Sequence, residues 1–217
     1  MREEDRDRDF WERKAPQYDR VVTGILGRPL PRVLELTASA VAGTEAVLEV
    51  AAGTGLITAV IAPRARQVIA TDYSDSMLAI LRERMKRTGI SNVEAARRDI
   101  YALGYPADSF DVVVAGNVLH LVSDLERALD ALCHVLRPRG KLITPTFVHD
   151  ETVLAWVASR VLEKVLRQPM RRRFTTTSLR QALERRGLRI ARAETIPGVI
   201  PVAYLESVLE PRPLEAP

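Results

Sequence analysis

Residues 47–55 read VLEVAAGTG, and this stretch determines how the rest of the sequence is interpreted. An apolar run that contains Glu49 passes into a turn with small residues at 51, 53 and 55. Residues 56–62 can continue as a helix. A strand, a tight turn and a helix in this order bring the backbone of an open α/β sheet close to a nucleotide-like ligand. Gly53 and Gly55 allow positive φ and place no Cβ in the way of that ligand.

The spacing of the glycines separates this turn from two common phosphate-binding loops. A dinucleotide fingerprint that starts at Gly53 requires a third glycine where Thr58 stands. No Gly-Lys-Ser/Thr follows, so a triphosphate loop is excluded as well.

The acidic Glu49 followed by small residues at alternate positions resembles the first motif of the class I S-adenosylmethionine-dependent methyltransferases. Most members have glycine at the position of Ala51, and alanine disfavours a strongly positive φ there. The resemblance covers about residues 10–147. It includes DSFDVVV at 108–114 and LRPRGK at 136–141, where many members have glycine in place of Arg139.

Composition favours a folded protein without a membrane span. The chain has 217 residues, 47% of them hydrophobic, and a net charge of +4. No apolar stretch reaches the roughly 18–20 residues that a bilayer requires, and the charged first residues do not resemble a secretory signal. The single Cys133 lies on an apolar helical pattern and is expected in the core. We therefore expect a cytoplasmic protein, with peripheral membrane contact left open.

Strand and helix patterns alternate along the chain, as in a doubly wound parallel sheet. Seven strands are expected, at 46–50, 67–71, 92–95, 110–115, 141–147, 188–196 and 200–209. Helices are expected at 29–40 and 74–87, after a capping box at 123–126, at 151–166 and after a second box at 178–181. The helix at 151–166 carries an apolar face of Val153, Val157, Val161 and Val165.

The resemblance implies a single Rossmann-like α/β domain over residues 1–217, with a mostly parallel sheet and an antiparallel C-terminal strand. Residues 1–40 are expected to form a helical lid and residues 41–147 the cofactor-binding core. Residues 148–217 are expected to supply helices that cover the substrate, together with the closing strands.

Acidic residues at strand ends mark the expected cofactor site. Asp72 follows the second strand, 23 residues after Glu49, close to the spacing at which a carboxylate reaches ribose hydroxyls. A solvated turn aspartate is the alternative.

In the resembling family, the position of Asp99 accepts from the adenine amino group and the amide of Ile100 binds a ring nitrogen. Tyr73 and Met77 match positions around ribose and adenine, although a methionine at this spacing also suits a core. Asn117, just past the fourth strand, is included in the expected cofactor site. S-adenosylmethionine is the implied cofactor, S-adenosylhomocysteine the implied product, and no metal site is expected.

Methyl transfer from a sulfonium needs mainly positioning, and a base only where the acceptor must lose a proton. His120 lies just past the fourth strand and is the candidate base, with a packing histidine as the alternative. Tyr18 matches the tyrosine of an Ala-x-x-Tyr-Asp signature that closes the pocket in many small-molecule members. An aromatic residue that only holds the N-terminal helix down is the other interpretation.

The acceptor is expected to be a small, apolar or lipid-like molecule, because residues after 147 supply apolar helices and no nucleic-acid module. The resembling group includes quinone-biosynthesis and bacterial phospholipid methyltransferases. Arg171, Arg172 and Arg173 are candidates to bind an anionic group on the acceptor, or else a solvated face. A non-catalytic S-adenosylmethionine-binding domain and a Rossmann-type oxidoreductase remain the alternatives, and the oligomeric state is open.

Overall fold

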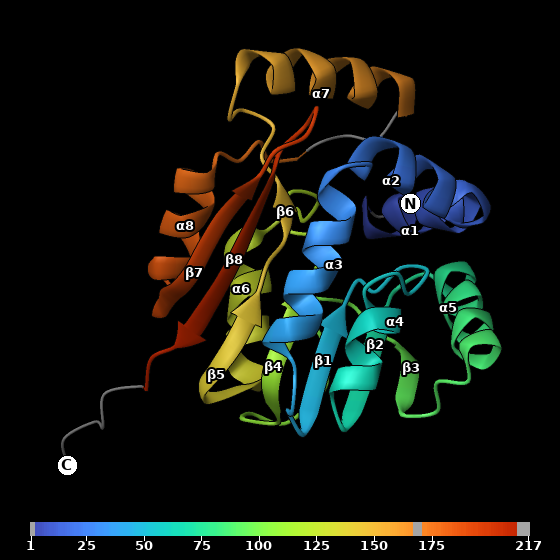
Figure 1. Cartoon of the computed structure of the whole chain (residues 1–217), viewed down its shortest axis with the longest axis vertical. Helices are drawn as coiled ribbons and strands as arrows, with labels where there is room; N and C mark the ends of the chain where they lie inside the picture. Colours follow the sequence, from blue (N-terminus) through green and yellow to red (C-terminus); the bar gives the residue numbers. More distant parts are fainter. Residues whose placement is uncertain (1–2, 167–170, 212–217) are drawn as a thin grey trace.

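Five parallel strands form the centre of the sheet in the computed structural model, which describes residues 3–166 and 171–211. Their order is β3-β2-β1-β4-β5, and antiparallel strands complete the edge next to β5 (Figure 1). The parallel strands are β1 Ala46–Val50, β2 Gln67–Asp72, β3 Val93–Arg97, β4 Phe110–Ala115 and β5 Leu136–Ile143. The others are β6 Thr146–Phe147, β7 Leu188–Ile196 and β8 Val202–Leu209. This architecture confirms the predicted mostly parallel α/β sheet with an antiparallel C-terminal strand, β8, which runs opposite to β5, β6 and β7.

Helices cover both faces of the sheet (Figure 1). The helices are α1 Glu3–Lys14, α2 Tyr18–Leu26, α3 Pro29–Ala40, α4 Thr58–Ile61, α5 Asp75–Thr88, α6 Leu125–Val135, α7 Val153–Leu166 and α8 Thr176–Glu184, with 3₁₀ turns at Ala15–Gln17 and Ala62–Arg64. None of these described helices is both long and apolar enough to cross a lipid bilayer.

Alternate residues of the central strands feed two separate apolar clusters, as a sheet with helices on both faces requires. Val112 and Val114 of β4 pack in the cluster that contains α3, whereas Val113 packs in the cluster that contains α6 and α8. All three valines are at most 1% exposed. Burying each such side chain contributes about 1.5–3 kcal/mol to folding, so the strand is fixed from both sides.

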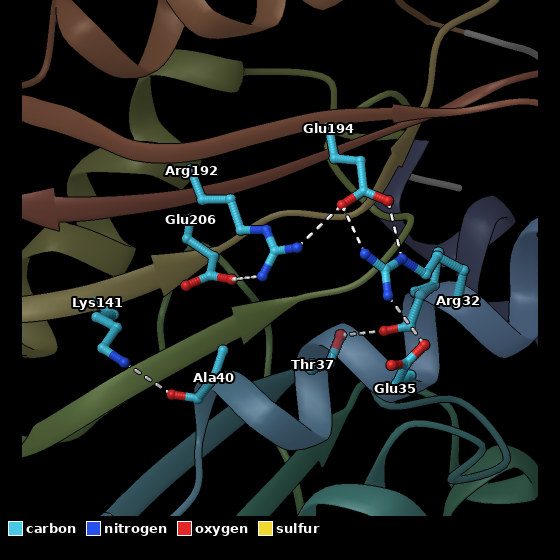
Figure 2. A network of polar contacts seen from close by, with 9 residues as sticks. Arg32, Glu35, Thr37, Ala40, Lys141, Arg192, Glu194 and Glu206 are labelled. Atoms are coloured by element: carbon cyan, nitrogen blue, oxygen red, sulfur yellow. Dashed lines mark hydrogen bonds and ion pairs between the residues drawn. The ribbon is translucent and has the colours of Figure 1, made fainter.

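Side-chain ion pairs tie α3 to the C-terminal strands (Figure 2). The Arg32 guanidinium donates to both carboxylate oxygens of Glu194 on β7, at 2.9 and 3.1 Å. Arg192 also donates to Glu194, at 3.0 Å, and Lys141 donates to the Ala40 carbonyl at 2.8 Å. These contacts join segments that are far apart in the sequence.

Both predicted capping boxes are shifted in the structure. The cap of α6 is Asp124, whose carboxylate accepts from the Arg127 amide at 3.1 Å, and not Ser123. The cap of α8 is Thr175, which forms a capping box with Ser178 as its third helical residue. The box at 123–126 contains the capping residue one position later than expected, whereas the cap of α8 lies three residues before the predicted box, whose Ser178 is its third helical residue.

Three further predictions are corrected. Pro145 interrupts the predicted fifth strand, which divides into β5 and β6. Cys133 is only half-buried, although it packs against the core cluster. The predicted apolar face of α7 is largely exposed: Val153, Val157 and Val161 are 81, 46 and 58% exposed. The Val165 side chain lies outside the described residues.

Candidate active site

The turn after β1 is built from residues with positive φ. Gly53 and Gly55 have φ of 56° and 82°, and Ala51 has φ of 50°. The expectation that alanine would avoid a positive φ at position 51 is therefore wrong, because the backbone keeps the left-handed conformation in spite of the Cβ. A Cβ on Gly55 would lie 2.8 Å from Cγ of Leu81 on α5. Gly55 is thus required by the packing of α5 against the turn.

Asp72 connects this turn to the next strand. Because β1 and β2 are parallel neighbours, their carboxyl ends lie side by side. One Asp72 carboxylate oxygen accepts from the Gly53 amide at 2.8 Å and the other from the Ser74 amide at 2.9 Å. The side chain is 6% exposed, and burial raises its pKa even though hydrogen bonds from Ser74 and Gly53 act against this. Each oxygen retains a second lone pair for a ligand.

Glu49 lies beneath the same turn and is also buried. Its carboxylate accepts from the Thr58 hydroxyl at 2.6 Å. Burial, with a contribution from the charge of Asp72, raises the pKa of Glu49 to about 8. Among the described residues, no lysine or arginine pairs with either Glu49 or Asp72. Two buried carboxyl groups without a cationic partner form a site that favours a positively charged ligand.

A cavity of about 820 Å³ lies beside the turn at the carboxyl ends of the parallel strands. This volume falls within the range of about 300–1,000 Å³ that is usual for ligand sites. Most of the predicted site residues contribute to its wall: Tyr18, Ala51, Gly53, Asp72, Tyr73, Met77, Asp99, Ile100 and Asn117. Glu49 instead lines a smaller pocket of about 50 Å³, which shares Tyr18, Ala51 and Asn117 with the large cavity. Gly55 lines neither of the two cavities described here.

Asp99, Met77 and Asn117 in the cavity wall differ in what holds them in place. Asp99 accepts from the Tyr101 amide at 2.9 Å, which fixes its carboxylate in the turn after β3. Met77 is 2% exposed and so belongs to the core as well as to the wall. Asn117 has φ of 53°, and its amide donates to the Pro145 carbonyl at 2.6 Å. The burial of Met77 and its place in the cavity wall are thus compatible both with a core residue and with a residue beside the cofactor.

The N-terminal helix α1 covers the cavity from outside the sheet. Phe10 and Trp11 line the wall, and the Trp11 ring meets the Tyr18 ring edge to face at 5.9 Å. Glu12 accepts from the amides of Asp75 and Ser76, at 2.7 and 3.0 Å, at the start of α5. A carboxylate at a helix N-terminus satisfies free amides and interacts favourably with the helix dipole. Glu12 thus docks the cover onto the core.

A second polar contact fixes Tyr18 over the glycine turn. Asp19 accepts from the Thr54 hydroxyl at 2.5 Å and forms an ion pair with Arg84 of α5. Arg84 also donates to the Thr54 carbonyl at 2.8 Å. The Tyr18 ring then lies where a Cβ on Gly53 would be 3.5 Å from it. Burial and the nearby carboxylates raise the pKa of the Tyr18 hydroxyl well above its usual value, so this hydroxyl stays neutral.

His120 is not placed where a base is needed. Its side chain is 3% exposed, is absent from the cavity wall, and packs against His149 with ring centroids 5.3 Å apart. Burial, and then the neighbouring His149, lowers the pKa of His120 to about 3. Burial and the charge of Arg173 lower the pKa of His149 to about 4. The structure therefore favours the packing interpretation of His120 over the predicted base.

The three predicted arginines have different surroundings. Arg171 lines the cavity. Arg172 donates to the Ser123 carbonyl at 3.3 Å. Arg173 donates to Glu163 and to the Ser159 hydroxyl, at 2.9 and 2.7 Å, and so holds α7 to the body. Of these three arginines, Arg171 lines the large cavity, and Arg173 is not a solvated residue.

Sequence reasoning missed Glu12, Asp19 and Arg84, although they position the cover and the turn. Asp19 directly follows Tyr18 in the signature that was recognised, and this adjacency was the available signal. Neither Glu12 nor Arg84 stands out in the sequence, because each depends on a partner more than 60 residues away.

Residues 48–144 match the sequence model of a family described as a methyltransferase domain. Over 140 residues the chain is 35% identical to a demethylmenaquinone methyltransferase of Clavibacter sepedonicus, which covers 64% of this chain and 56% of that protein. It is 34% identical to a ubiquinone/menaquinone biosynthesis C-methyltransferase of Cronobacter sakazakii, over 61% of this chain and 55% of the relative. The chain spans little more than half the length of these relatives.

Solved structures agree on the fold. A possible histamine N-methyltransferase from Thermotoga maritima superposes with a TM-score of 0.73 at 19% identity, covering 93% of this chain and 99% of the other. Residues 48–144 are thus similar to a methyltransferase domain, and the chain shares its fold with solved S-adenosylmethionine-dependent methyltransferases.

Proposed function

We propose that the protein transfers a methyl group from S-adenosylmethionine to a ring carbon of a small, lipid-like quinol. The observation that carries the proposal is the pair of buried carboxyl groups, Glu49 and Asp72, beside an 820 Å³ cavity and without a cationic partner among the residues that the structure describes. S-adenosylmethionine carries positive charge on its ammonium and sulfonium groups, which suits such a site. The quinone-biosynthesis names of the similar proteins supply the acceptor class.

The cofactor would be held by side chains of three strand ends. Asp72 would accept from the ribose hydroxyls with its free lone pairs, and Glu49 would face the amino group across the turn. Asp99 and the Ile100 amide would bind the adenine edge, between the walls of Tyr73 and Met77. When bound, S-adenosylmethionine supplies an electrophilic methyl group on its sulfonium.

The residues of this chain contribute positioning and exclusion of water. Holding two reactants in line can replace a large part of the entropic cost of a bimolecular step. The neutral Tyr18 hydroxyl cannot take a proton, and His120 lies behind the cavity wall. We therefore assign neither side chain the role of a base. Tyr18 and Trp11 instead close the cofactor end of the cavity.

The acceptor would occupy the part of the cavity near Asn117, Leu121 and Arg171. Leu121 offers an apolar surface to a ring, and Arg171 offers a guanidinium group to a ring oxygen or another anionic group. A reduced quinone ring has an electron-rich unsubstituted carbon that would form the new bond to the methyl group, with S-adenosylhomocysteine as the leaving group. The proton on that carbon would then pass to water, so an oriented ring needs no additional nucleophile.

The proposal is tested with S-adenosylmethionine labelled in its methyl group and with demethylmenaquinone kept reduced by dithionite. We expect labelled menaquinol, which is recovered as menaquinone after oxidation in air, and no product with oxidised demethylmenaquinone. Label that appears only in phospholipid from a lipid extract would move the acceptor to that class. Tight S-adenosylmethionine binding without label in any extract fraction would show a non-catalytic binding domain.

A further inference from the structure

Helix α7 presents large apolar side chains to the outside. Val153 and Leu154 are 81 and 67% exposed, Val161 is 58% exposed, and Trp156 and Val157 are each 46% exposed. These five residues are called the outer face of α7. The only other large hydrophobic side chain of comparable exposure in the described part of the chain is Val199. Single exposed apolar residues are common, but a contiguous group on one helix marks an interaction surface.

The side of α7 that contacts the body carries small residues instead. Ala155 and Ser159 are fully buried, and Ala158 packs against a core cluster. A surface helix normally buries its large apolar residues and exposes its polar ones. In α7 this arrangement is reversed. The outer face is therefore not the remainder of an ordinary core-packing helix.

Basic groups lie among the apolar residues of the outer face. The Arg160 guanidinium lies 5.5 Å from the centroid of the Trp156 ring, and Lys164 is exposed one turn further on. The only acidic residue of α7, Glu163, is turned toward Arg173 at 2.9 Å. The charges that α7 presents to its surroundings are thus positive.

The position of α7 relates this surface to the cavity. In Figure 1, α7 lies beyond the carboxyl ends of the parallel strands, the edge of the sheet at which the cavity lies. Arg171 follows α7 in sequence and lines the cavity. A surface that bound the outer face would therefore meet the protein at the edge that contains the cavity.

We infer that the outer face of α7 docks on an anionic lipid surface. An aromatic residue with valines, leucine and nearby cations is the composition of a helix that lies in the plane of a membrane interface. Helix α7 has 14 residues, whereas a helix needs roughly 20 to span a bilayer, so α7 is too short to do so. Long basic side chains extend toward the headgroups while their stems stay among apolar groups. Two positively charged copies of α7 would repel one another, which disfavours a second protomer as the occupant.

The inference goes beyond the proposed function, because docking requires neither cofactor nor turnover. Vesicles of phosphatidylcholine, alone or with an equal amount of phosphatidylglycerol, are sedimented with the full-length protein. We expect binding to the mixed vesicles and weak binding to the neutral ones. In a Trp11→Phe background, Trp156 emission should shift to shorter wavelength only with the mixed vesicles.

Two variants separate the apolar from the charged contribution. Leu154→Gln with Val157→Gln and Val161→Gln should lower the partition coefficient at least about tenfold. Val199→Gln, at the exposed hydrophobic position outside α7, is the matched control and should bind as wild type. Arg160→Gln with Lys164→Gln should lower binding about fivefold for each charge removed. The matched control is Lys86→Gln with Arg87→Gln on α5, two exposed cations away from α7.

Circular dichroism and the thermal midpoint establish that each variant is folded. Sedimentation velocity without lipid tests the alternative that the outer face of α7 binds a second copy of the chain. A dimer that the α7 glutamine variant converts to monomers, together with no vesicle binding by wild type, would assign the outer face to a second copy and overturn the inference. Vesicle binding that is equal in wild type and the α7 variants would overturn it as well.

Discussion

The edge of the sheet formed by β1–β3 and the segment that follows β6 differ in what fixes their functional side chains. At the first edge, Asp72 and Asp99 accept hydrogen bonds from backbone amides of the turns beside them. In residues 148–174, His149 packs against His120 and Arg173 donates to side chains of α7, so each side chain depends on other side chains. Backbone amides are placed by the turns that carry them, whereas side-chain partners are placed by tertiary packing.

Among the variants that test this comparison, Asp72→Ala should have the largest effect, which is on S-adenosylmethionine affinity. The substitution leaves the Gly53 and Ser74 amides without their acceptor and removes the proposed ribose contact. We expect S-adenosylmethionine binding to weaken by about 1.5–3 kcal/mol, the range for hydrogen bonds to a charged group. Isothermal titration calorimetry on protein shown to be folded measures this. Wild-type affinity in a folded Asp72→Ala protein would remove Asp72 from the cofactor site.

The buried histidine pair should make the second region sensitive to acid. The pKa of His149 is lowered to about 4 by burial and Arg173, so below the unfolded pKa of about 6.5 the unfolded chain binds more protons than the folded one. Stability is therefore complete above pH 6.5 and falls as the pH drops toward 4. Between pH 7 and pH 5 we expect a loss of about 2 kcal/mol for one such histidine.

Urea denaturation of His149→Gln at the two pH values tests this expectation, since the variant should lose the share of the dependence that comes from His149, about 2 kcal/mol, and keep the share from the buried His120. His134→Gln, at an exposed histidine of α6, is the matched control and should keep the wild-type profile. Equal pH dependence in both variants would show that the pair does not control acid stability.

A smaller effect is expected at the aromatic cover. The Tyr18 ring packs over Gly53 and against Trp11, whereas its hydroxyl is assigned no chemistry. Tyr18→Ala should weaken S-adenosylmethionine binding by about 1 kcal/mol, and Tyr18→Phe should leave it nearly unchanged. A large fall in kcat for Tyr18→Phe at unchanged affinity would instead give the hydroxyl a part in the reaction.

The smallest expected effect is the release of a proton from Glu49 when the cofactor binds. With a pKa raised to about 8 by burial, Glu49 is protonated at pH 6.5 before ligand binds. A cationic ligand favours the carboxylate, so S-adenosylmethionine binding should release about one proton. Calorimetry in two buffers of different ionisation enthalpy measures this number. In Glu49→Gln the release should disappear, and an unchanged release would place the titrating group elsewhere.

The sequence predicted the strands and the cofactor turn well because hydrophobic periodicity and glycine placement act over a few residues. It failed at Ala51, which has a positive φ although alanine disfavours that conformation. It also failed at α7, because periodicity shows that a helix has an apolar side but not that the side faces the core. Position after a strand likewise does not give the direction of a side chain, and His120 is buried and does not line the large cavity.

The network of α3 in Figure 2 has a consequence for synthesis on the ribosome. Arg32 is separated from its partner Glu194 by 162 residues, so the bond cannot form until nearly the whole chain has emerged. Pairing of β1 with β2 and β4 requires far less of the chain. We expect the cofactor turn to form in the nascent chain while α3 still lacks its final partner. Contacts of such separation are also slow to form in refolding, which makes the C-terminal hairpin the last part to close.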